Sequence, residues 1–352
     1  MVSATLVSSH AVSEIAAART VTGHKMPFIT PKYGVASYRL TYKTLDGYGQ
    51  LVTASGLVSV PAKALNAQSP LLSYQHGTIF KDAEAPSNAA LPSEPPIALA
   101  SQGYIVIAAD YVGYGASRGN DHPYLLSGPT AASVVDLLTA ARTWRNTIGL
   151  RDNGQLFLAG YSEGGYATVA THRALQTGVP NSLLHYPQLV SSVTGAGPNH
   201  VGVTLDAVLD RVRQENPLVG ALISPGFLSQ LGSTLRNEVR RLILKTLMPS
   251  DSEVNFQPRF LDNYLADDAA AIERDSNVHA WGPLRGLRLF HGRDDELVSY
   301  RSSTVTLAAM QAAGSVSVSL TDCAATPSSH SGCVTPYFQF ALPLLAAAAR
   351  DL

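Results

Sequence analysis

The chain has 352 residues, of which 45% are hydrophobic and only 14% are charged, and its formal net charge at pH 7 is −1. This composition supplies ample material for a buried core and argues against intrinsic disorder. Positive and negative residues are interspersed and no run of Lys or Arg occurs, which argues against nucleic acid or an anionic membrane as the partner. The length accommodates one large α/β domain with an insertion, or two domains.

The start of the chain is mixed in character and weakly patterned, and we expect residues 1–34 to form an N-terminal arm on the surface. Residues 1–20 show neither the basic nor the apolar region of a signal peptide, because Glu14 and Arg19 interrupt their Ala and Val residues. The low charge suits a secreted or periplasmic protein, and we expect that location with the signal peptide already removed. The late apolar run at 338–349 is too short to span a bilayer, so stable membrane insertion is not expected.

Runs of β-branched and apolar residues predict the strands of a mostly parallel sheet flanked by helices, which is an α/β fold. Two of these runs flank Asp46-Gly47 and are expected to form an antiparallel hairpin. Fully apolar runs are typical of buried parallel strands. The strands are expected at 37–44, 51–60, 70–75, 104–109, 155–159, 189–196, 287–290 and 316–320, and the main helices at 130–145, 166–177, 301–313 and 334–352.

Residues 155–178 contain the strongest chemical signal, a G-x-S-x-G pattern centred on Ser162 between an apolar run and a helix-like spacing. A serine at such a sharp strand-to-helix turn has a strained backbone, and Gly160 and Gly164 let the strand and the helix approach closely. The turn exposes the Ser162 hydroxyl as a nucleophile, and the start of the helix offers the Glu163 N–H to a developing negative charge. The alternative is a chance match of the pattern in a loop.

A second turn follows the strand expected at 70–75, where His76 precedes Gly77 and Thr78. A glycine just beyond a strand lets the backbone aim its next N–H into the crevice at the carboxyl edge of the sheet, where open α/β sheets bind ligands. We therefore predict that the N–H groups of Thr78 and Glu163 form an oxyanion hole. The alternative is that His76 is a structural histidine and that the turn has no chemical role.

The segment 199–283 differs from the rest of the chain in its pattern of apolar residues. Apolar residues recur at helical spacing in two stretches, and no strand-like run is present. Inserted between two core strands, this segment would lie over the carboxyl edge of the sheet as a helical cap, or lid; the alternative is that its helices are ordinary packing layers. The expected domain plan is an N-terminal arm (1–34), a first part of the core (35–198), the cap (199–283) and a second part of the core (284–352).

A serine hydroxyl becomes nucleophilic when a histidine accepts its proton, and that histidine needs an acid to orient it. His330 follows the last expected strand, whereas His291, which also follows a strand, stands beside Gly292 and suggests a turn. For the acid, Asp294 and Asp295 compete after the penultimate strand.

The two cysteines of the chain, Cys323 and Cys333, flank His330. In an oxidising compartment they would close a short loop with a disulfide that pins the histidine, at a gain in stability of about 2 to 3 kcal/mol. The alternative is two free thiols.

Together these motifs resemble the α/β-hydrolase family over nearly the whole chain from about residue 35. In that family the acid follows the histidine of an H-G-x-x-D-x-x-V pattern by four residues, which implies Asp295 rather than Asp294, although Ser299 stands where a proline often follows the valine. The order Ser, Asp, His along the chain is also that of the family. The DYVGYGAS stretch from Asp110 and the HPYL stretch after it are similar to the secreted lipase and esterase branch.

The resemblance implies a serine hydrolase that cleaves carboxylic esters through an acyl-enzyme, with Ser162, His330 and Asp295 as the triad and Thr78 and Glu163 as oxyanion donors. No cofactor is expected, and no HExxH or H-x-H spacing indicates a metal site. The expected partner is a small-molecule ester, and the sequence indicates no oligomeric state. Peptide or amide hydrolysis and acyl transfer on the same triad stay open, as does a non-catalytic binding protein on a hydrolase scaffold.

Overall fold

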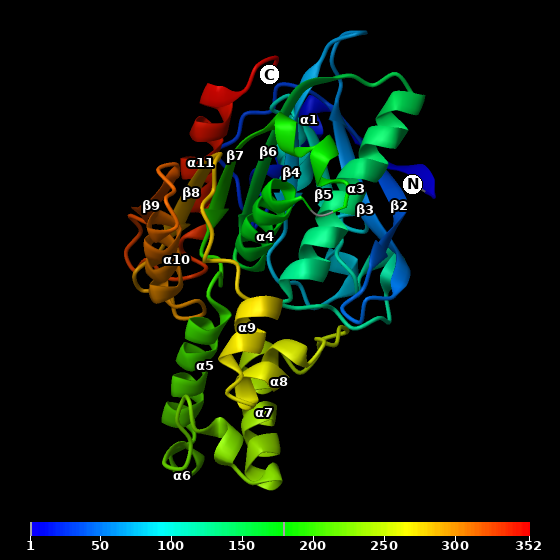
Figure 1. Cartoon of the computed structure of the whole chain (residues 1–352). Helices are drawn as coiled ribbons and strands as arrows, with labels where there is room; N and C mark the ends of the chain where they lie inside the picture. The colour runs from blue at the N-terminus through cyan, green and yellow to red at the C-terminus, as the bar shows by residue number, and fades with distance from the viewer. Residues whose placement is uncertain (1, 179) are drawn as a thin grey trace.

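The computed structural model describes residues 2–178 and 180–352, and within them the strands form one nine-stranded sheet (Figure 1). The strands are β1 Ser3–His10, β2 Val35–Leu45, β3 Leu51–Pro61, β4 Ser69–Gln75, β5 Ile105–Ala109, β6 Asp152–Tyr161, β7 Leu189–Gly195, β8 Gly286–His291 and β9 Val318–Asp322. Their order in the sheet is β1-β2-β3-β5-β4-β6-β7-β8-β9. The pairs from β1 to β5 are antiparallel, and those from β5 to β9 are parallel.

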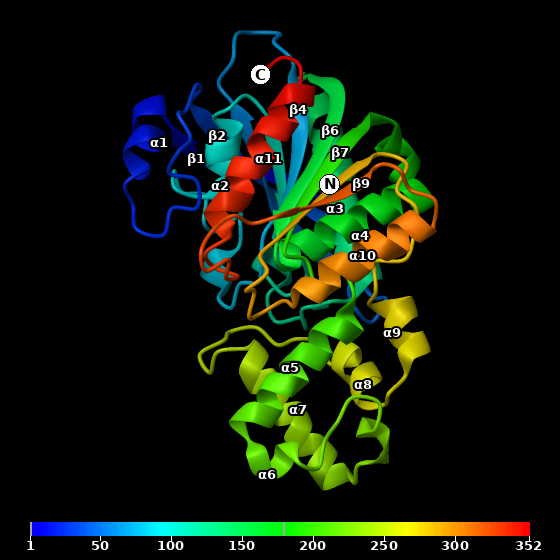
Figure 2. The same cartoon turned by 90° about the vertical axis from the view of Figure 1, so that its left-hand side faces the viewer.

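Helices cover both faces of the sheet (Figure 2). They are α1 Val12–Ala18, α2 Pro95–Ala100, α3 Ser127–Thr147, α4 Glu163–Thr177, α5 Val201–Glu215, α6 Pro217–Gly220, α7 Ser233–Leu247, α8 Arg259–Leu265, α9 Ala269–Asp275, α10 Tyr300–Ala312 and α11 Val334–Ala348. Helices α3, α4 and α10 pack on one face, and α2 and α11 pack on the other. None of the helices in the described part of the chain has the length and apolar character needed to cross a lipid bilayer.

The sheet confirms the predicted α/β architecture. Every residue of β4 and β5 is buried, because helices cover both faces of these central strands, and this explains their continuous apolar runs. β2 and β3 form the antiparallel hairpin that was predicted on either side of Asp46-Gly47. The last strand begins two residues later than predicted, at Val318, and the fully exposed Val316 lies outside it.

The first strand, β1, was not predicted, since the sequence analysis expected only a surface arm in this part of the chain. β1 pairs with β2 alone and forms one edge of the sheet. Most of its residues are exposed, so neither of its faces requires a periodic apolar pattern. The strand therefore follows from hydrogen bonding to β2 rather than from a signal in its own sequence.

The chain between β7 and β8 forms a helical lobe that projects beyond the sheet, with α5, α7 and α8 at its centre (Figures 1 and 2). Its entry and its exit lie side by side. The Val278 N–H donates to the carbonyl of Asn199 over 2.9 Å, and the Val201 N–H donates to Oδ1 of Asn277 over 2.8 Å. We call these four residues the clasp, because they join the two chain ends of the lobe at the edge of the core.

Candidate active site

Ser162 occupies the sharp turn between β6 and α4. Its backbone has φ 61° and ψ −125°, a conformation that is strained for any residue with a side chain. A side chain at Gly160 would collide with the carbonyl of Gly164, and one at Gly164 would collide with the carbonyl of Gln75. The two glycines therefore have the role that the sequence predicted, and the Ser162 N–H is held by the Gly195 carbonyl over 2.8 Å.

The structure brings Ser162, His330 and Asp295 together from three loops at one edge of the sheet. His330 lies between β9 and α11, and its Nε2 is 2.9 Å from Oγ of Ser162. Its Nδ1 is 2.7 Å from Oδ2 of Asp295, which follows β8. This chain of hydrogen bonds runs from hydroxyl to imidazole to carboxylate, the geometry in which a histidine can take a proton from a serine.

The Asp295 carboxylate is fully buried yet well supplied with donors. Its Oδ1 accepts the N–H groups of Leu297 and Val298 over 2.9 and 2.8 Å, and its Oδ2 also lies 3.1 Å from Nε2 of His291. Burial alone would raise the pKa of Asp295, but the hydrogen bonds from His291 and His330 outweigh it and hold that pKa well below its usual range. The carboxylate therefore stays ionised at mildly acidic pH. Gly292 beside His291 suggested a turn role for this histidine, and its contact with the acid was not predicted.

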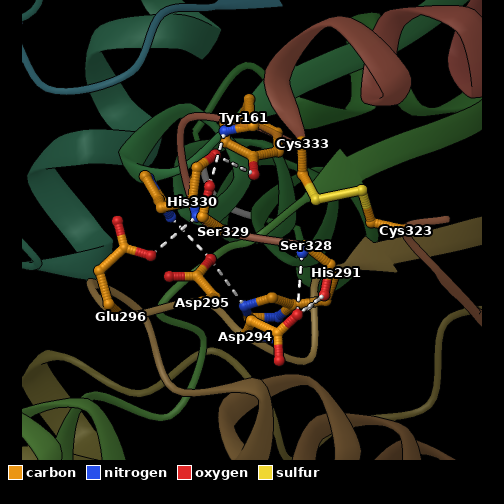
Figure 3. The surroundings of a disulfide bond; sticks show 11 residues. Tyr161, His291, Asp294, Asp295, Glu296, Cys323, Ser328, Ser329, His330 and Cys333 are labelled. Atoms are coloured by element: carbon orange, nitrogen blue, oxygen red, sulfur yellow. Dashed lines mark hydrogen bonds and ion pairs between the residues drawn. A yellow bond between two sulfur atoms is a disulfide. The ribbon is translucent and has the colours of Figure 1, made fainter. Parts of the chain in front are cut away.

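The neighbouring Asp294 contacts Ser328 rather than His330 (Figure 3). Its Oδ2 accepts both the N–H and the Oγ–H of Ser328 over 2.9 Å, and its own N–H donates to Ser328 Oγ over 3.1 Å. These hydrogen bonds lower the pKa of Asp294. Asp294 thus ties the loop after β8 to the loop that carries His330, and Asp295 alone of the two contacts the histidine.

The chain is similar to known lipases and esterases. A model of the secretory lipase family matches residues 97–216, about a third of the chain, which include Ser162. A proposed hydrolase from Legionella pneumophila is 23% identical, with a TM-score of 0.76 over 98% of this chain and 97% of that one. A mutant of the rice cell wall degrading esterase LipA from Xanthomonas oryzae is 23% identical, with a TM-score of 0.71 over 97% and 98%. Candida antarctica lipase A in its closed state is 15% identical, with a TM-score of 0.59 over 99% and 83%.

The chain has the α/β-hydrolase fold and is similar to secreted lipases and esterases. A search of curated proteins found no match. Because the identities to the solved structures lie below 25%, those structures establish the fold of the chain, and its activity and substrate have to be inferred from the site.

A disulfide between Cys323 and Cys333 closes the loop that carries His330 (Figure 3). Cys323 directly follows β9 and Cys333 directly precedes α11, so the bond joins the two ends of the loop. Inside the loop, the Tyr161 hydroxyl donates to the His330 carbonyl over 2.8 Å, and the His330 N–H donates to Oε2 of Glu296 over 3.1 Å. The disulfide thus joins the two ends of the loop, and hydrogen bonds to the backbone of His330 position the histidine within it.

Replacing both cysteines with serine should lower the free energy of unfolding by about 2 to 3 kcal/mol, since the unfolded chain gains freedom that the disulfide denies it. Turnover should fall as well, because the His330 loop loses its covalent closure. Urea unfolding followed by tryptophan fluorescence, with ester hydrolysis measured on the same samples, checks both expectations. Treating the native protein with a reductant should reproduce the effect, and an unchanged unfolding midpoint would contradict it.

The two residues predicted to supply the oxyanion hole lie near the nucleophile. Glu163 is the first residue of α4, so its N–H has no partner within the helix. Thr78 lines the same cavity as Ser162 and His330. In the described part of the chain neither N–H donates a hydrogen bond to a backbone carbonyl outside the regular elements or to a side chain, so both are free to bind a ligand. Their role as oxyanion donors stays a prediction.

His76, beside this turn, makes structural contacts. Its ring stacks on Tyr111 with 4.3 Å between the ring centroids, and its Nδ1 lies 2.7 Å from the Gly77 carbonyl. Burial lowers the pKa of His76, which favours the neutral ring. These contacts agree with the alternative that His76 has a structural role. They hold the turn that presents the Thr78 N–H.

A buried pair that the sequence analysis did not predict supports the nucleophile turn. Nε2 of His122 is 2.6 Å from Oε1 of Glu163, and the two side chains are 1% and 2% exposed. The other ring nitrogen of His122 lies 2.8 Å from the Val112 carbonyl, so it carries a proton. The backbone of His122 also binds the segment of the lobe between α7 and α8, donating to the Asn255 carbonyl and accepting from the Gln257 N–H over 2.8 Å each. Because the partners are 41 positions apart in the sequence, no local spacing signals the pair.

A cavity of about 650 Å³ opens above Ser162 and His330 and is bounded by both the core and the helical lobe. Much of its wall is apolar and includes Phe80, Tyr124, Leu205, Val208, Met248 and Phe338. The segment 79–96 also contributes to this wall. No group of three or more His, Cys, Asp or Glu side chains within residues 2–178 and 180–352 is arranged to hold a metal ion.

Proposed function

We propose that the protein hydrolyses carboxylic esters through an acyl-enzyme intermediate. The observation that carries the proposal is the continuous hydrogen-bond chain from Ser162 through His330 to the buried Asp295 at the floor of a largely apolar cavity. The match of residues 97–216 to the secretory lipase family supports the same chemistry. An apolar cavity of this size suits the acyl or aromatic part of an ester.

In the proposed reaction, Ser162 Oγ attacks the ester carbonyl while His330 Nε2 takes the hydroxyl proton. The N–H groups of Thr78 and Glu163 stabilise the oxyanion, and losing one such donor would cost roughly 3 to 4 kcal/mol in the barrier. The C–O bond to the alcohol then breaks, and His330 returns its proton to the leaving oxygen. Water, activated by the same histidine, releases the acid, while Asp295 holds the imidazole in the required orientation.

We further propose that the lobe at 199–283 acts as the cap of the site, inserted between the two parts of the core at 35–198 and 284–352. Residues of α5 and of the end of α7 form one wall of the cavity above Ser162, which supports this role. The family match and the disulfide also support a secreted protein, since disulfides persist in oxidising compartments.

The test is hydrolysis of p-nitrophenyl esters of increasing acyl length, compared with p-nitroanilides of the same acids. Rapid ester turnover with little anilide cleavage is expected, and the optimum chain length would measure the acyl pocket. Adding a competing alcohol separates hydrolysis from acyl transfer, because a transferase would form the new ester in preference to the free acid. Faster anilide cleavage would favour a peptidase or amidase, and no turnover by a folded protein would favour a binding protein.

A further inference from the structure

The cavity changes character along helix α5. Residues Thr204, Leu205, Val208 and Arg211 line it from a single helix, so the wall runs from the core outward along α5. Seven residues of helix correspond to about 10 Å, which separates the start of this wall from its end. Leu205 and Val208 make the middle of this wall apolar, and Arg211 lies at its outer end. Lys245, near the end of α7, lines the cavity beside the apolar Leu247 and Met248.

Arg211 and Lys245 differ in their ion pairing from other cations on α5 and α7. Arg213 of α5 binds Asp210 over 3.0 Å, and Arg241 of α7 forms a bidentate pair with Glu238. Neither Arg213 nor Arg241 lines the cavity. Arg211 and Lys245, which do, form no ion pair with any carboxylate in the part of the chain that the structure describes.

The carboxylates of the cavity wall, Glu84 and Glu94, belong to the core side of the cavity. Oε2 of Glu84 accepts the N–H groups of Phe80 and Lys81 over 3.0 and 3.1 Å. Glu94 lines a small second cavity of about 140 Å³ together with Lys25, and both residues also line the main cavity. The cap end of the main cavity therefore carries positive charge without a compensating acid, although the whole chain is close to neutral.

We propose that the cap end of the cavity is a subsite for a carboxylate, carried by the ester substrate at the end remote from the scissile bond. The half-buried Arg211 presents the planar donor fork that binds carboxylates in pairs of hydrogen bonds, and Lys245 adds a point charge. The apolar stretch between Ser162 and Arg211 takes the hydrocarbon part. This inference rests on the proposed ester hydrolysis and names the class of ester: one with an anionic far end.

The experiment compares two ester series on the native protein. Mono-p-nitrophenyl esters of dicarboxylic acids with six to ten carbons carry a free carboxylate, and p-nitrophenyl alkanoates of matched length carry none. A second arm places the carboxylate on the alcohol, using butyrate esters of hydroxybenzoates against phenyl butyrate. The same measurements are made on the double variant Arg211→Gln/Lys245→Gln. Arg213→Gln is the matched control, because it removes a cation from the same helix outside the cavity.

The subsite predicts that kcat/KM is at least about tenfold higher for the acidic ester than for its neutral match in one of the two arms. The preference should fall by about tenfold in the double variant, mainly through KM, and should weaken with added salt, while Arg213→Gln keeps it. Neutral esters preferred in both arms, or a preference that the double variant retains, would overturn the subsite and leave ester hydrolysis standing. No turnover of any ester and no labelling of Ser162 by a fluorophosphonate would overturn both.

Discussion

Replacing Ser162 with alanine is expected to lower kcat for esters by about 10⁴-fold or more and to abolish covalent labelling by a fluorophosphonate probe. The substitution removes the one hydroxyl that lies 2.9 Å from His330 Nε2. The oxyanion donors and the cavity remain, so KM should change little. Both measurements require the native protein to label and to turn over first.

Ser331→Ala is the matched control for this experiment. Ser331 lines the same cavity and is exposed, but its hydroxyl has no hydrogen bond to the histidine. Labelling should persist in this variant. Labelling that survives Ser162→Ala, or that disappears equally in Ser331→Ala, would mean that another side chain is the nucleophile and would remove the basis of the proposed mechanism.

The second large effect is expected from Asp295→Asn, which keeps the shape of the side chain and removes its charge. An amide can donate to the histidine nitrogen that now faces a carboxylate, and this would stabilise the wrong tautomer of His330; a loss of about 10⁴-fold in kcat is expected. His291 would also face a neutral amide in place of the ionised oxygen it now contacts. The kcat for a p-nitrophenyl ester, with circular dichroism to verify folding, measures this effect.

Asp294→Asn is the comparison that separates the two neighbouring acids. Asp294 binds Ser328 and makes no contact with His330, so its amide variant should lose less than about tenfold in turnover and a small part of its stability. The reverse ranking of the two variants would assign the acid to Asp294. Equal and small losses would mean that the histidine needs no acid to orient it.

The elements that carry the site were readable from the sequence because the fold imposes strong patterns on them. β4 and β5 are buried on both faces and therefore show unbroken apolar runs, and the glycines around Ser162 follow from the close approach of β6 and α4. The ends of two late strands indicated His330 and either Asp294 or Asp295, and the resemblance to α/β-hydrolases selected Asp295. Their convergence on Ser162 agrees with that prediction, and their catalytic roles await the experiments above.

Other features of the structure could not be predicted from the sequence alone. β1 is held by backbone hydrogen bonds at an exposed edge, and such bonds place no demand on side-chain type. The His122–Glu163 pair joins residues that are distant along the chain, and the contact of His291 with Asp295 depends on how a loop folds back on its own strand. Tertiary structure, rather than local propensity, decides contacts of this kind.

The clasp that joins Asn199 and Val201 to Asn277 and Val278 gives the helical lobe the connections of an exchangeable module. Since the chain leaves and re-enters the core at one point, insertions, deletions or a whole foreign segment between the clasp residues would leave β7 and β8 in register. If the lobe is the proposed cap, such changes would alter the substrates while Ser162, His330 and Asp295 keep their positions. For protein engineering, the clasp marks where the lobes of proteins with this fold are best exchanged to build chimaeras.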